Sequence, residues 1–340
     1  MGRRVRVCVI GAGRVGRVHS TNISCRIPLA ELVAVVDQAV EAAKALASDL
    51  KVNYYTSLSE ALKKEDFDAV FITTPTFTHC DLAVEAAEAG KHVFCEKPMA
   101  LNLEEADKMI SAARRNNVKL QIGFMRRFDP ELRRAKELIA EGVIGKPVLI
   151  KSTGRGPGLP PKWALDPRTG LSMVAEVNSH DFDCLRWLME DEFRSIYADA
   201  DALIRPDVAK EYPGFHDVVV VMTRFVKGGI GLIDGACPVG YGYDARVEVL
   251  GTEGLITIGE IQGTTILVCH KDKKITTEPF PSWRNRFKEA YVAEAEGFIK
   301  AIIEDREPEV TGEDGKKALE AAIATFQSIK EHRPISLPLK

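Results

Sequence analysis

The chain has 340 residues, of which 45% are hydrophobic and 28% are charged, and its formal net charge is −3. This length exceeds what one hydrophobic core usually serves, so we expect two domains of a soluble globular protein. A charge balance so close to neutral argues against a nucleic-acid-binding protein and against attraction to anionic membranes.

Cysteine usage and hydropathy predict a cytoplasmic protein. The seven cysteines are scattered, their number is odd, and no two of them form a Cys-x-x-Cys pair. A disulfide framework and the usual zinc spacings are therefore not expected, and we predict no metal site. No apolar stretch reaches the ~20 residues of a membrane helix. The apolar run Val5–Ile10 is too short for the core of an export signal.

Up to Gly123, short apolar runs alternate with helical patterns. Runs that are apolar throughout are typical of strands covered on both faces, and they occur at Val5–Ile10, Leu32–Val36, Ala69–Thr73, His92–Phe94 and Leu120–Gly123. Helices are expected over Ala39–Asp49 and after capping signals at Ser57 and Asn102. The alternation predicts an α/β domain over residues 1–123 with a doubly wound parallel sheet.

The pattern changes over residues 124–340. A strand over Lys146–Thr153 and a helix over about Met173–Met189 are expected first. Strands without intervening helices follow at Ser195–Leu203, Asp217–Phe225, Ile230–Ala236, Ala245–Leu250, Leu255–Ile258 and Thr265–His270. Helices near Arg286–Glu304 and Glu313–Glu331 complete the chain. Consecutive strands joined by short turns predict an α+β domain with a mainly antiparallel open sheet.

A glycine-rich turn follows the first predicted strand and opens a helix. Its glycines, Gly11, Gly13 and Gly16, have the spacing that allows a tight turn, a close approach to pyrophosphate and close helix–strand packing. The positive end of the helix would hold the phosphates. The residues expected to contact the dinucleotide here are Gly11, Ala12, Gly13, Arg14 and Val15.

Asp37 ends the second predicted strand, about 20 residues beyond the last glycine. A carboxylate at this place accepts hydrogen bonds from the ribose hydroxyls of NAD and repels a 2′-phosphate, so NAD is favoured over NADP. Gln38 supplies no compensating cation, whereas Arg14 keeps the use of NADP open.

A polar turn follows the predicted central strand at Ala69–Thr73. Doubly wound sheets hold ligands at the carboxyl ends of such strands. We therefore expect Thr74, Pro75 and Thr76 to line the ribose or nicotinamide side of the cofactor. Alternatively, Thr76 is the N-cap of a helix, and the two roles are compatible. His79 is a further cofactor-side candidate, although its place inside that helix favours a structural role.

Glu96-Lys97-Pro98 follows the predicted strand at His92–Phe94. Pro98 favours an extended conformation of Lys97. A lysine beside bound nicotinamide would hold the substrate hydroxyl, favour the developing alkoxide and lower the pKa of that alcohol. Glu96 is expected on the cofactor side. The alternative is a surface lysine paired with Glu96.

The glycine turn, Asp37, the Thr-Thr-Pro-Thr-x-Thr-His run and the Glu-Lys-Pro motif resemble the glucose–fructose oxidoreductase/inositol dehydrogenase/MocA family. The resemblance covers essentially the whole chain. The runs 123–129, 240–244 and 249–254 are similar to those of bacterial inositol 2-dehydrogenases. The resemblance implies a Rossmann domain that binds NAD and a second domain for substrate and oligomerisation. It also implies NAD-dependent oxidation of a secondary alcohol of a cyclic polyol to a ketone, by a homodimer or homotetramer.

The resemblance also places the remaining catalytic pair in the predicted helix Met173–Met189. The Asp-x-x-x-His pattern of inositol dehydrogenases matches Glu176 to His180. Residues four apart share one face of a helix, so both are expected to face the substrate. Neutral imidazole, with a reference pKa of about 6.5, suits His180 as the base that accepts the hydroxyl proton. Glu176 would hold the imidazolium or a neighbouring substrate hydroxyl, whereas an exposed ion pair is the alternative.

Two positions depart from the inositol dehydrogenase pattern. Glu176 replaces the usual Asp and adds one C–C bond, about 1.5 Å of reach. Gly156 stands where the compared enzymes have Asn after the Arg, and it has no side-chain hydrogen bond to offer. A site that lacks one polar contact suits a differently hydroxylated ring. A monosaccharide or anhydrosugar, with NAD or NADP, is therefore the alternative substrate.

Further side chains are expected to bind the substrate's hydroxyls. Beside Lys97, Glu176 and His180, the candidates are Arg127, Arg155, Tyr241 and Tyr243. Arg127 is equally suited to a salt bridge where the two domains meet. Trp163 lies in a long loop and is a candidate for substrate contact or for packing.

Two other classes of protein compete with a dehydrogenase. A metal-dependent hydrolase could use Glu176, His180 and Asp183, but no second histidine lies at ligand spacing. A non-catalytic dinucleotide sensor would be expected to lose Lys97 or His180, and both are present. The sequence therefore favours an enzyme whose partner is a small polyol or sugar.

Overall fold

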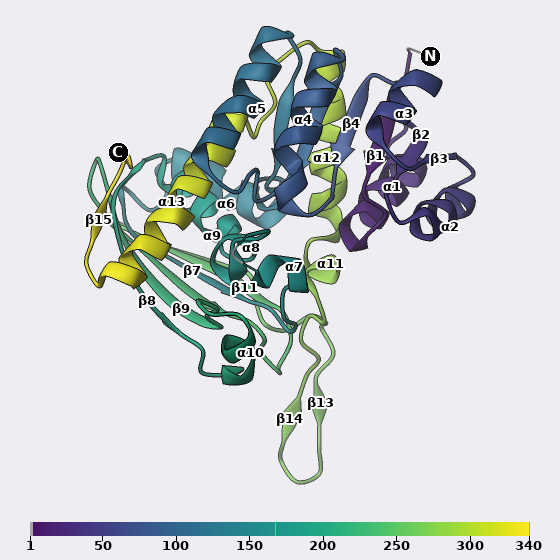
Figure 1. Cartoon of the computed structure of the whole chain (residues 1–340). Coiled ribbons are helices and arrows are strands. Elements are labelled where there is room, and N and C mark those ends of the chain that lie inside the picture. Colours follow the sequence, from purple (N-terminus) through teal and green to yellow (C-terminus); the bar gives the residue numbers. More distant parts are fainter. Residues whose placement is uncertain (1–2, 167, 340) are drawn as a thin grey trace. The chain divides into compact units, whose positions relative to one another are not determined.

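The computed structural model describes residues 3–166 and 168–339 and divides into two compact units. Unit 1 comprises residues 1–128 and 289–319, and unit 2 comprises residues 129–288 and 320–340. Each unit is described by itself below (Figure 1). Among the described residues, no helix has the length and apolar composition needed to cross a membrane.

Unit 1 contains a six-stranded parallel sheet in the order β3-β2-β1-β4-β5-β6. Its strands are β1 (Val5–Ile10), β2 (Ala30–Val36), β3 (Asn53–Tyr55), β4 (Ala69–Ile72), β5 (His92–Glu96) and β6 (Leu120–Gly123). The intervening helices are α1 (Arg14–Arg26), α2 (Val40–Leu50), α3 (Leu58–Lys64), α4 (His79–Glu88) and α5 (Leu103–Arg115). The doubly wound order confirms the predicted α/β class.

Local signals in the sequence account for most of unit 1. β1 and β6 have the predicted bounds. All side chains of β4 are buried, which explains why a continuous apolar run forms a central strand. The capping signals are confirmed, because Ser57 accepts a hydrogen bond from the Glu60 N–H and Asn102 accepts one from the Glu105 N–H. The three-residue edge strand β3 was not predicted, since it has no fully buried face.

A late segment of the chain completes the core of unit 1. Helix α12 (Lys288–Ile303) belongs almost wholly to this unit, and Figure 1 shows it among elements from the beginning of the chain. Its Ala295, Phe298 and Ile299 share a hydrophobic cluster with residues such as Phe71 and Phe94. The compact units therefore differ from the domains expected from the sequence, which divided the chain after residue 123. The difference arises because the apolar face of α12 is buried against the first sheet.

Unit 2 is built on a seven-stranded mixed sheet in the order β12-β11-β7-β10-β9-β8-β15. Its strands are β7 (Pro147–Arg155), β8 (Phe193–Asp201), β9 (Val218–Phe225), β10 (Ile230–Ala236), β11 (Asp244–Gly251), β12 (Leu255–Ile258) and β15 (Ile335–Ser336). The β7–β10 pair is parallel and the other pairs are antiparallel, so the predicted mainly antiparallel sheet is confirmed. The strand predicted over Thr265–His270 is shorter in the structure. It is β13 (Val268–Cys269), which pairs with β14 (Ile275–Thr276).

The helices of unit 2 differ from the predicted pattern in one important place. They are α6 (Pro130–Ala140), α7 (Lys162–Leu165), α8 (Ser172–Glu176), α9 (Ser179–Met189), α10 (Pro206–Glu211) and α11 (Trp283–Arg286), and α13 (Gly312–Glu331) runs from unit 1 into unit 2. The single helix predicted over Met173–Met189 is wrong, because it is divided into α8 and α9. The division falls at residues 177 and 178, where the Asn178 N–H reaches back five residues to the Met173 carbonyl.

Candidate active site

The glycine turn lies at the point of the first sheet where the strand order reverses, between β1 and β4. Gly11 has a φ of +105°, and a Cβ there would lie 2.8 Å from the carbonyl oxygen of Thr73. A Cβ on Gly16 would lie 1.8 Å from the Gly11 carbonyl oxygen, whereas one on Gly13 would meet no described residue within 4 Å other than its chain neighbours. Two of the glycines are therefore required by packing, and Gly13 opens onto free space as a close approach to pyrophosphate requires.

These contacts predict different effects of alanine at two of the glycines. Gly16→Ala is expected to lower stability by about 1–3 kcal/mol, because its methyl group meets backbone atoms that cannot move aside. Gly13→Ala adds a methyl group in open space and should leave the unfolding temperature near wild type while weakening dinucleotide binding. Thermal unfolding and cofactor titration of both variants test this. Equal loss of stability in both would contradict it.

Asp37 follows β2 and faces the glycine turn. Its carboxylate accepts hydrogen bonds from the Ala12 N–H at 2.7 Å and from the Ala39 N–H at 2.8 Å. The turn and the acid predicted to bind ribose are thus joined directly. Helix α1 begins at Arg14, and its N-cap residue, Gly13, has no side chain to cap the helix. Its positive end therefore suits phosphate oxygens.

The polar turn after β4 is tied to the glycine turn by Thr73. The Thr73 hydroxyl donates to the carbonyl oxygens of Ile10 and Gly11, at 2.9 and 3.0 Å. Thr73 begins the Thr-Thr-Pro-Thr-x-Thr-His run, but no role was predicted for it from the sequence. The Thr78 hydroxyl donates to that of Thr74 at 2.7 Å. Thr76 is buried in a short 3₁₀ turn, and helix α4 begins three residues later at His79.

His79 connects two of the predicted cofactor turns. Its Nδ1 lies 2.9 Å from the Pro98 carbonyl oxygen and its Nε2 lies 2.9 Å from that of Thr74. Burial lowers the pKa of His79, so at neutral pH the uncharged ring donates to only one of the two carbonyls at a time. These contacts give His79 a structural role that holds the Thr74 and Pro98 turns together. A direct contact with cofactor stays a prediction.

The Glu-Lys-Pro motif lies at the same edge of the sheet, at the end of β5. The Lys97–Pro98 peptide bond is cis. The Lys97 N–H donates to Oε2 of Glu96 at 3.3 Å. Glu96 is buried, and its Oε1 lies 2.9 Å from Nε2 of His19 on α1. Glu96 therefore pairs with a buried histidine, a partner that the sequence analysis missed because α1 is distant along the chain.

In unit 2, His180 is the second residue of α9, and Glu176 ends α8. His180 is buried at 6% exposure, and Glu176 is partly exposed. Glu176 and His180 were expected to share one face of a single continuous helix. Because the structure divides that helix, their joint catalytic role stays a prediction.

The beginning of α9 is anchored on the sheet of unit 2 by its polar residues. Asp181 accepts hydrogen bonds from the Ser152 hydroxyl at 2.6 Å and from the Asn178 amide at 2.8 Å. A Cβ on Gly154 would lie 2.3 Å from the Asp181 carboxylate, and one on Gly235 would lie 2.5 Å from the Asn178 amide. The bare backbone of β7 and β10 thus makes room for both side chains. Asn178 and Asp181 therefore hold the turn that carries His180.

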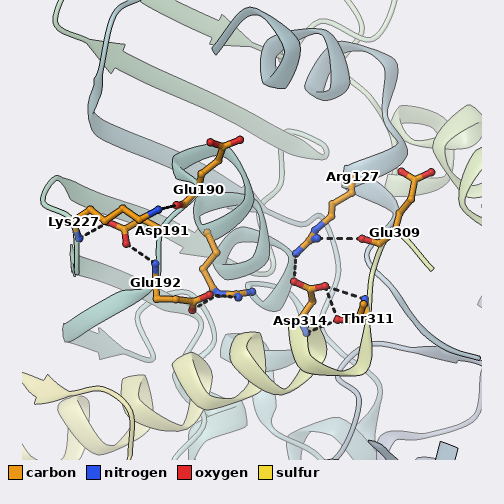
Figure 2. A network of polar contacts seen from close by, with 9 residues as sticks. Arg127, Glu190, Asp191, Glu192, Lys227, Glu309, Thr311 and Asp314 are labelled. Atoms are coloured by element: carbon orange, nitrogen blue, oxygen red, sulfur yellow. Dashed lines mark hydrogen bonds and ion pairs between the residues drawn. The ribbon is translucent and has the colours of Figure 1, made fainter. Parts of the chain in front are cut away.

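The other end of α9 is held by a second set of contacts (Figure 2). Asp191 accepts hydrogen bonds from the N–H groups of Glu192 and Lys227, at 2.8 and 2.7 Å. The Lys227 ammonium donates to the Glu190 carbonyl at 2.6 Å. Together these contacts tie the segment after α9 to the turn between β9 and β10. Hydrogen bonds therefore anchor α9, the helix that carries His180, near both of its ends.

Arg127 lies in unit 1 and forms an ion pair with Asp314 of the same unit. Its guanidinium donates to Asp314 at 2.8 Å and to the Glu309 carbonyl at 3.4 Å (Figure 2). Burial raises the pKa of Asp314, but the Arg127 charge and the hydrogen bonds from Thr311 outweigh this and leave it below its usual value. A direct substrate contact for Arg127 stays a prediction.

The remaining substrate candidates lie in unit 2. Arg155, at the end of β7, pairs with Asp234 and donates to the Tyr241 hydroxyl at 3.2 Å. These contacts raise the pKa of Arg155 above its usual value. Tyr243 is buried, and its ring meets that of Phe287 edge-on at 6.1 Å. Trp163 is partly exposed on α7, and its carbonyl accepts a hydrogen bond from Thr169. Arg155 and Tyr241 thus form one polar group, and Tyr243 packs in the core.

The doubly wound sheet with a glycine turn, a following acid and a lysine at its carboxyl edge defines a dinucleotide-dependent oxidoreductase. Family models bear this out, since residues 5–124 match an oxidoreductase family with an NAD-binding Rossmann fold. Residues 136–337 match the C-terminal alpha/beta domain of the same family. The chain belongs to the glucose–fructose oxidoreductase/inositol dehydrogenase/MocA family.

Relatives extend over the full length of the chain. An uncharacterized oxidoreductase, YrbE, of Bacillus subtilis is 37% identical, with 99% of this chain and 98% of the relative covered. The myo-inositol 2-dehydrogenase of Thermotoga maritima is 34% identical, with 98% of each covered. The crystal structure of scyllo-inositol dehydrogenase from Lactobacillus casei with bound NAD(H) and scyllo-inositol superposes with a TM-score of 0.91. It is 25% identical, and the match covers 98% of this chain and 99% of that one.

Proposed function

We propose that this protein oxidises a secondary alcohol of a cyclic polyol to a ketone, with NAD as the hydride acceptor. The observation that carries the proposal is the common edge of unit 1, where the glycine turn, Asp37 and Lys97 follow strands β1, β2 and β5 of one parallel sheet. The dinucleotide and the lysine ammonium would therefore meet at the same edge. The names of full-length relatives support an inositol as the polyol.

The residues of the chain would share the work as follows. NAD, when bound over the open space at Gly13, supplies the hydride acceptor. The Lys97 ammonium holds the reacting hydroxyl and stabilises its developing negative charge. His180 accepts the proton of that hydroxyl, and Glu176 holds the resulting imidazolium or a neighbouring hydroxyl.

A monosaccharide or anhydrosugar is the second candidate substrate, and Gly156 favours it. A Cβ at this position would lie 3.4 Å from the sulfur of Cys237, and the glycine has no side chain to bind a hydroxyl. A ring with one hydroxyl fewer, or with a different stereochemistry, loses less in such a site than myo-inositol does. The polar pair of Arg155 and Tyr241 then sets which hydroxyls are recognised.

We further propose that the protein is a cytoplasmic homodimer or homotetramer. All seven cysteines are free, as suits a reducing compartment. Val220 and Met222 on β9 are 54% and 40% exposed, and apolar side chains on an open sheet face suit a symmetric subunit contact. Light scattering of the purified protein measures the subunit number, and a monomer at all concentrations would refute this assignment.

A panel of inositols, hexoses, pentoses and anhydrosugars, each with NAD and NADP, tests the proposed activity. We expect substrate-dependent formation of reduced cofactor with at least one inositol and NAD, followed at the absorbance band of the reduced nicotinamide. Turnover of sugars alone would select the second candidate. Binding of NAD without turnover of any compound in the panel would indicate a dinucleotide sensor and not an enzyme.

A further inference from the structure

Unit 1 contains a buried trio of ionisable side chains next to the turn that carries Lys97. The trio consists of His19 on α1, Glu96 at the end of β5 and Glu294 on α12, which are 0%, 5% and 0% exposed. Nε2 of His19 lies 2.9 Å from Oε1 of Glu96 and 3.9 Å from Oε1 of Glu294. The proposed mechanism assigns no chemistry to His19 or Glu294, so their burial needs another explanation.

The environment of Glu294 favours its neutral form. Among the described residues, neither of its carboxyl oxygens has a hydrogen-bond partner, and a buried carboxylate without a partner is costly. The titratable groups around it are His19 from α1, Glu96 from β5 and Tyr291 from its own helix, while β6 contributes the uncharged amide of Gln121. Burial, with the nearby Glu96 charge second, raises the pKa of Glu294 well above its usual range.

Glu96 is the member of the trio suited to carry the negative charge. Its carboxylate has the His19 ring at one oxygen and the Lys97 N–H at the other, at 2.9 and 3.3 Å. The Cα of Gly123 packs closely on it, since a Cβ there would lie 3.1 Å from the Glu96 carboxyl carbon. A proton on Glu294 removes the repulsion between its carboxyl group and that of Glu96, since one oxygen of each lies within 4.8 Å of the other.

A hydrogen bond between His19 and Glu96, beside an uncharged Glu294, explains the trio better than a metal site does. The 2.9 Å separation of His19 and Glu96 is a normal hydrogen-bond distance. A metal-bound imidazole usually donates its other N–H to a partner, whereas Nδ1 of His19 finds no partner in the part of the chain that the structure describes. His19 is instead surrounded by aromatic rings, with the Phe94 and Tyr291 centroids at 5.0 and 5.7 Å.

We propose that Glu294 is a positioning residue that carries a proton at neutral pH and so leaves Glu96 as the charged carboxylate, which accepts hydrogen bonds from His19 and from the backbone of Lys97. The hydrogen bond from the Lys97 N–H to Glu96 is the direct link to the lysine. Gln121 donates to the Glu294 carbonyl at 3.1 Å and fixes α12 against β6. The kinetic part of this proposal rests on the proposed role of Lys97, whereas the protonation of Glu294 is independent of it.

The pH dependence of stability tests the protonation. An acid whose pKa is raised in the folded state stabilises the fold at low pH. This stability is lost as the pH rises above the pKa of the same group in the unfolded chain, which is about 4.3. Glu294→Gln has no proton to lose. We therefore expect the unfolding constant of wild type, relative to that of Glu294→Gln, to rise by up to about tenfold per pH unit between pH 5 and 8. A ratio that stays flat overturns the proposal.

A control variant and a second measurement make this test specific. Glu296→Gln makes the same change on the same helix at a partly exposed carboxylate paired with Lys300. Its unfolding constant should keep a nearly constant ratio to wild type over the same range. Infrared spectra of the wild-type protein at pH 8 should contain a protonated-carboxyl band. Absence of that band overturns the proposal even if Glu294→Gln fails to fold.

Kinetics tests the positioning role. We expect Glu294→Gln, a neutral side chain of the same shape, to keep kcat within about twofold at pH 7, whereas Glu294→Ala loses more than about tenfold with NAD affinity retained. Equal kcat values for folded Glu294→Ala and wild type would overturn the positioning role. If the wild type itself oxidises no polyol, the proposed function fails, while the pH and infrared measurements still decide the protonation.

Discussion

Replacement of Lys97 by methionine is expected to lower kcat for polyol oxidation by about 10²- to 10⁴-fold. Methionine keeps the length and most of the volume of the side chain but removes the ammonium that would stabilise the developing alkoxide. NAD affinity should remain close to wild type, because the proposed dinucleotide contacts of the glycine turn and Asp37 would not involve the lysine side chain. Steady-state kinetics and cofactor titration measure the two quantities separately.

Two further variants isolate the role of the Lys97 charge. Lys108→Met makes the same substitution on the exposed surface of α5 in the same unit and should leave kcat unchanged. Lys97→Arg keeps the positive charge but places it on a planar guanidinium group. We therefore expect it to retain only part of the kcat that Lys97→Met loses. Parallel losses of kcat and NAD affinity in Lys97→Met would assign the lysine to cofactor binding instead.

The glycine turn could be predicted from sequence because its constraints are local. Gly11 needs a positive φ and Gly16 lies against the Gly11 carbonyl, so the spacing of the glycines and the short distance along the chain carry the information. A few neighbouring residues likewise determine the apolar runs of β1 and β4 and the helix caps at Ser57 and Asn102.

What could not be predicted depends on segments that meet only after folding. Glu96 lies 77 residues from His19, and Glu294 comes from a helix near the end of the chain, so no local pattern joins the trio. The interruption between α8 and α9 was also missed, because Asn178 is accommodated by Gly235 from a distant strand. A helical pattern of apolar residues continues through this interruption, and periodicity alone cannot detect it.

His180→Ala is expected to lower kcat to a similar extent, about 10²- to 10⁴-fold, through loss of the proton acceptor. The variant should also lose the acidic limb of the pH profile of kcat/KM, because no imidazole remains to titrate. His270→Ala removes an exposed histidine from the β13–β14 hairpin of the same unit and serves as the matched control. Since His180 is buried, thermal unfolding must accompany the kinetics. An unchanged acidic limb in a folded His180→Ala variant would assign the base to another residue.

Combining the two variants decides whether the lysine and the histidine act on one hydroxyl. Groups that act as a unit have strongly non-additive effects, since removal of either one already disables the shared step. We therefore expect the Lys97→Met/His180→Ala double variant to lose little more activity than the worse single variant. Residues acting on separate steps or separate hydroxyls would instead multiply their losses. Multiplication of the two losses would leave each residue important but would break the proposed pairing of ammonium and imidazole at one substrate oxygen.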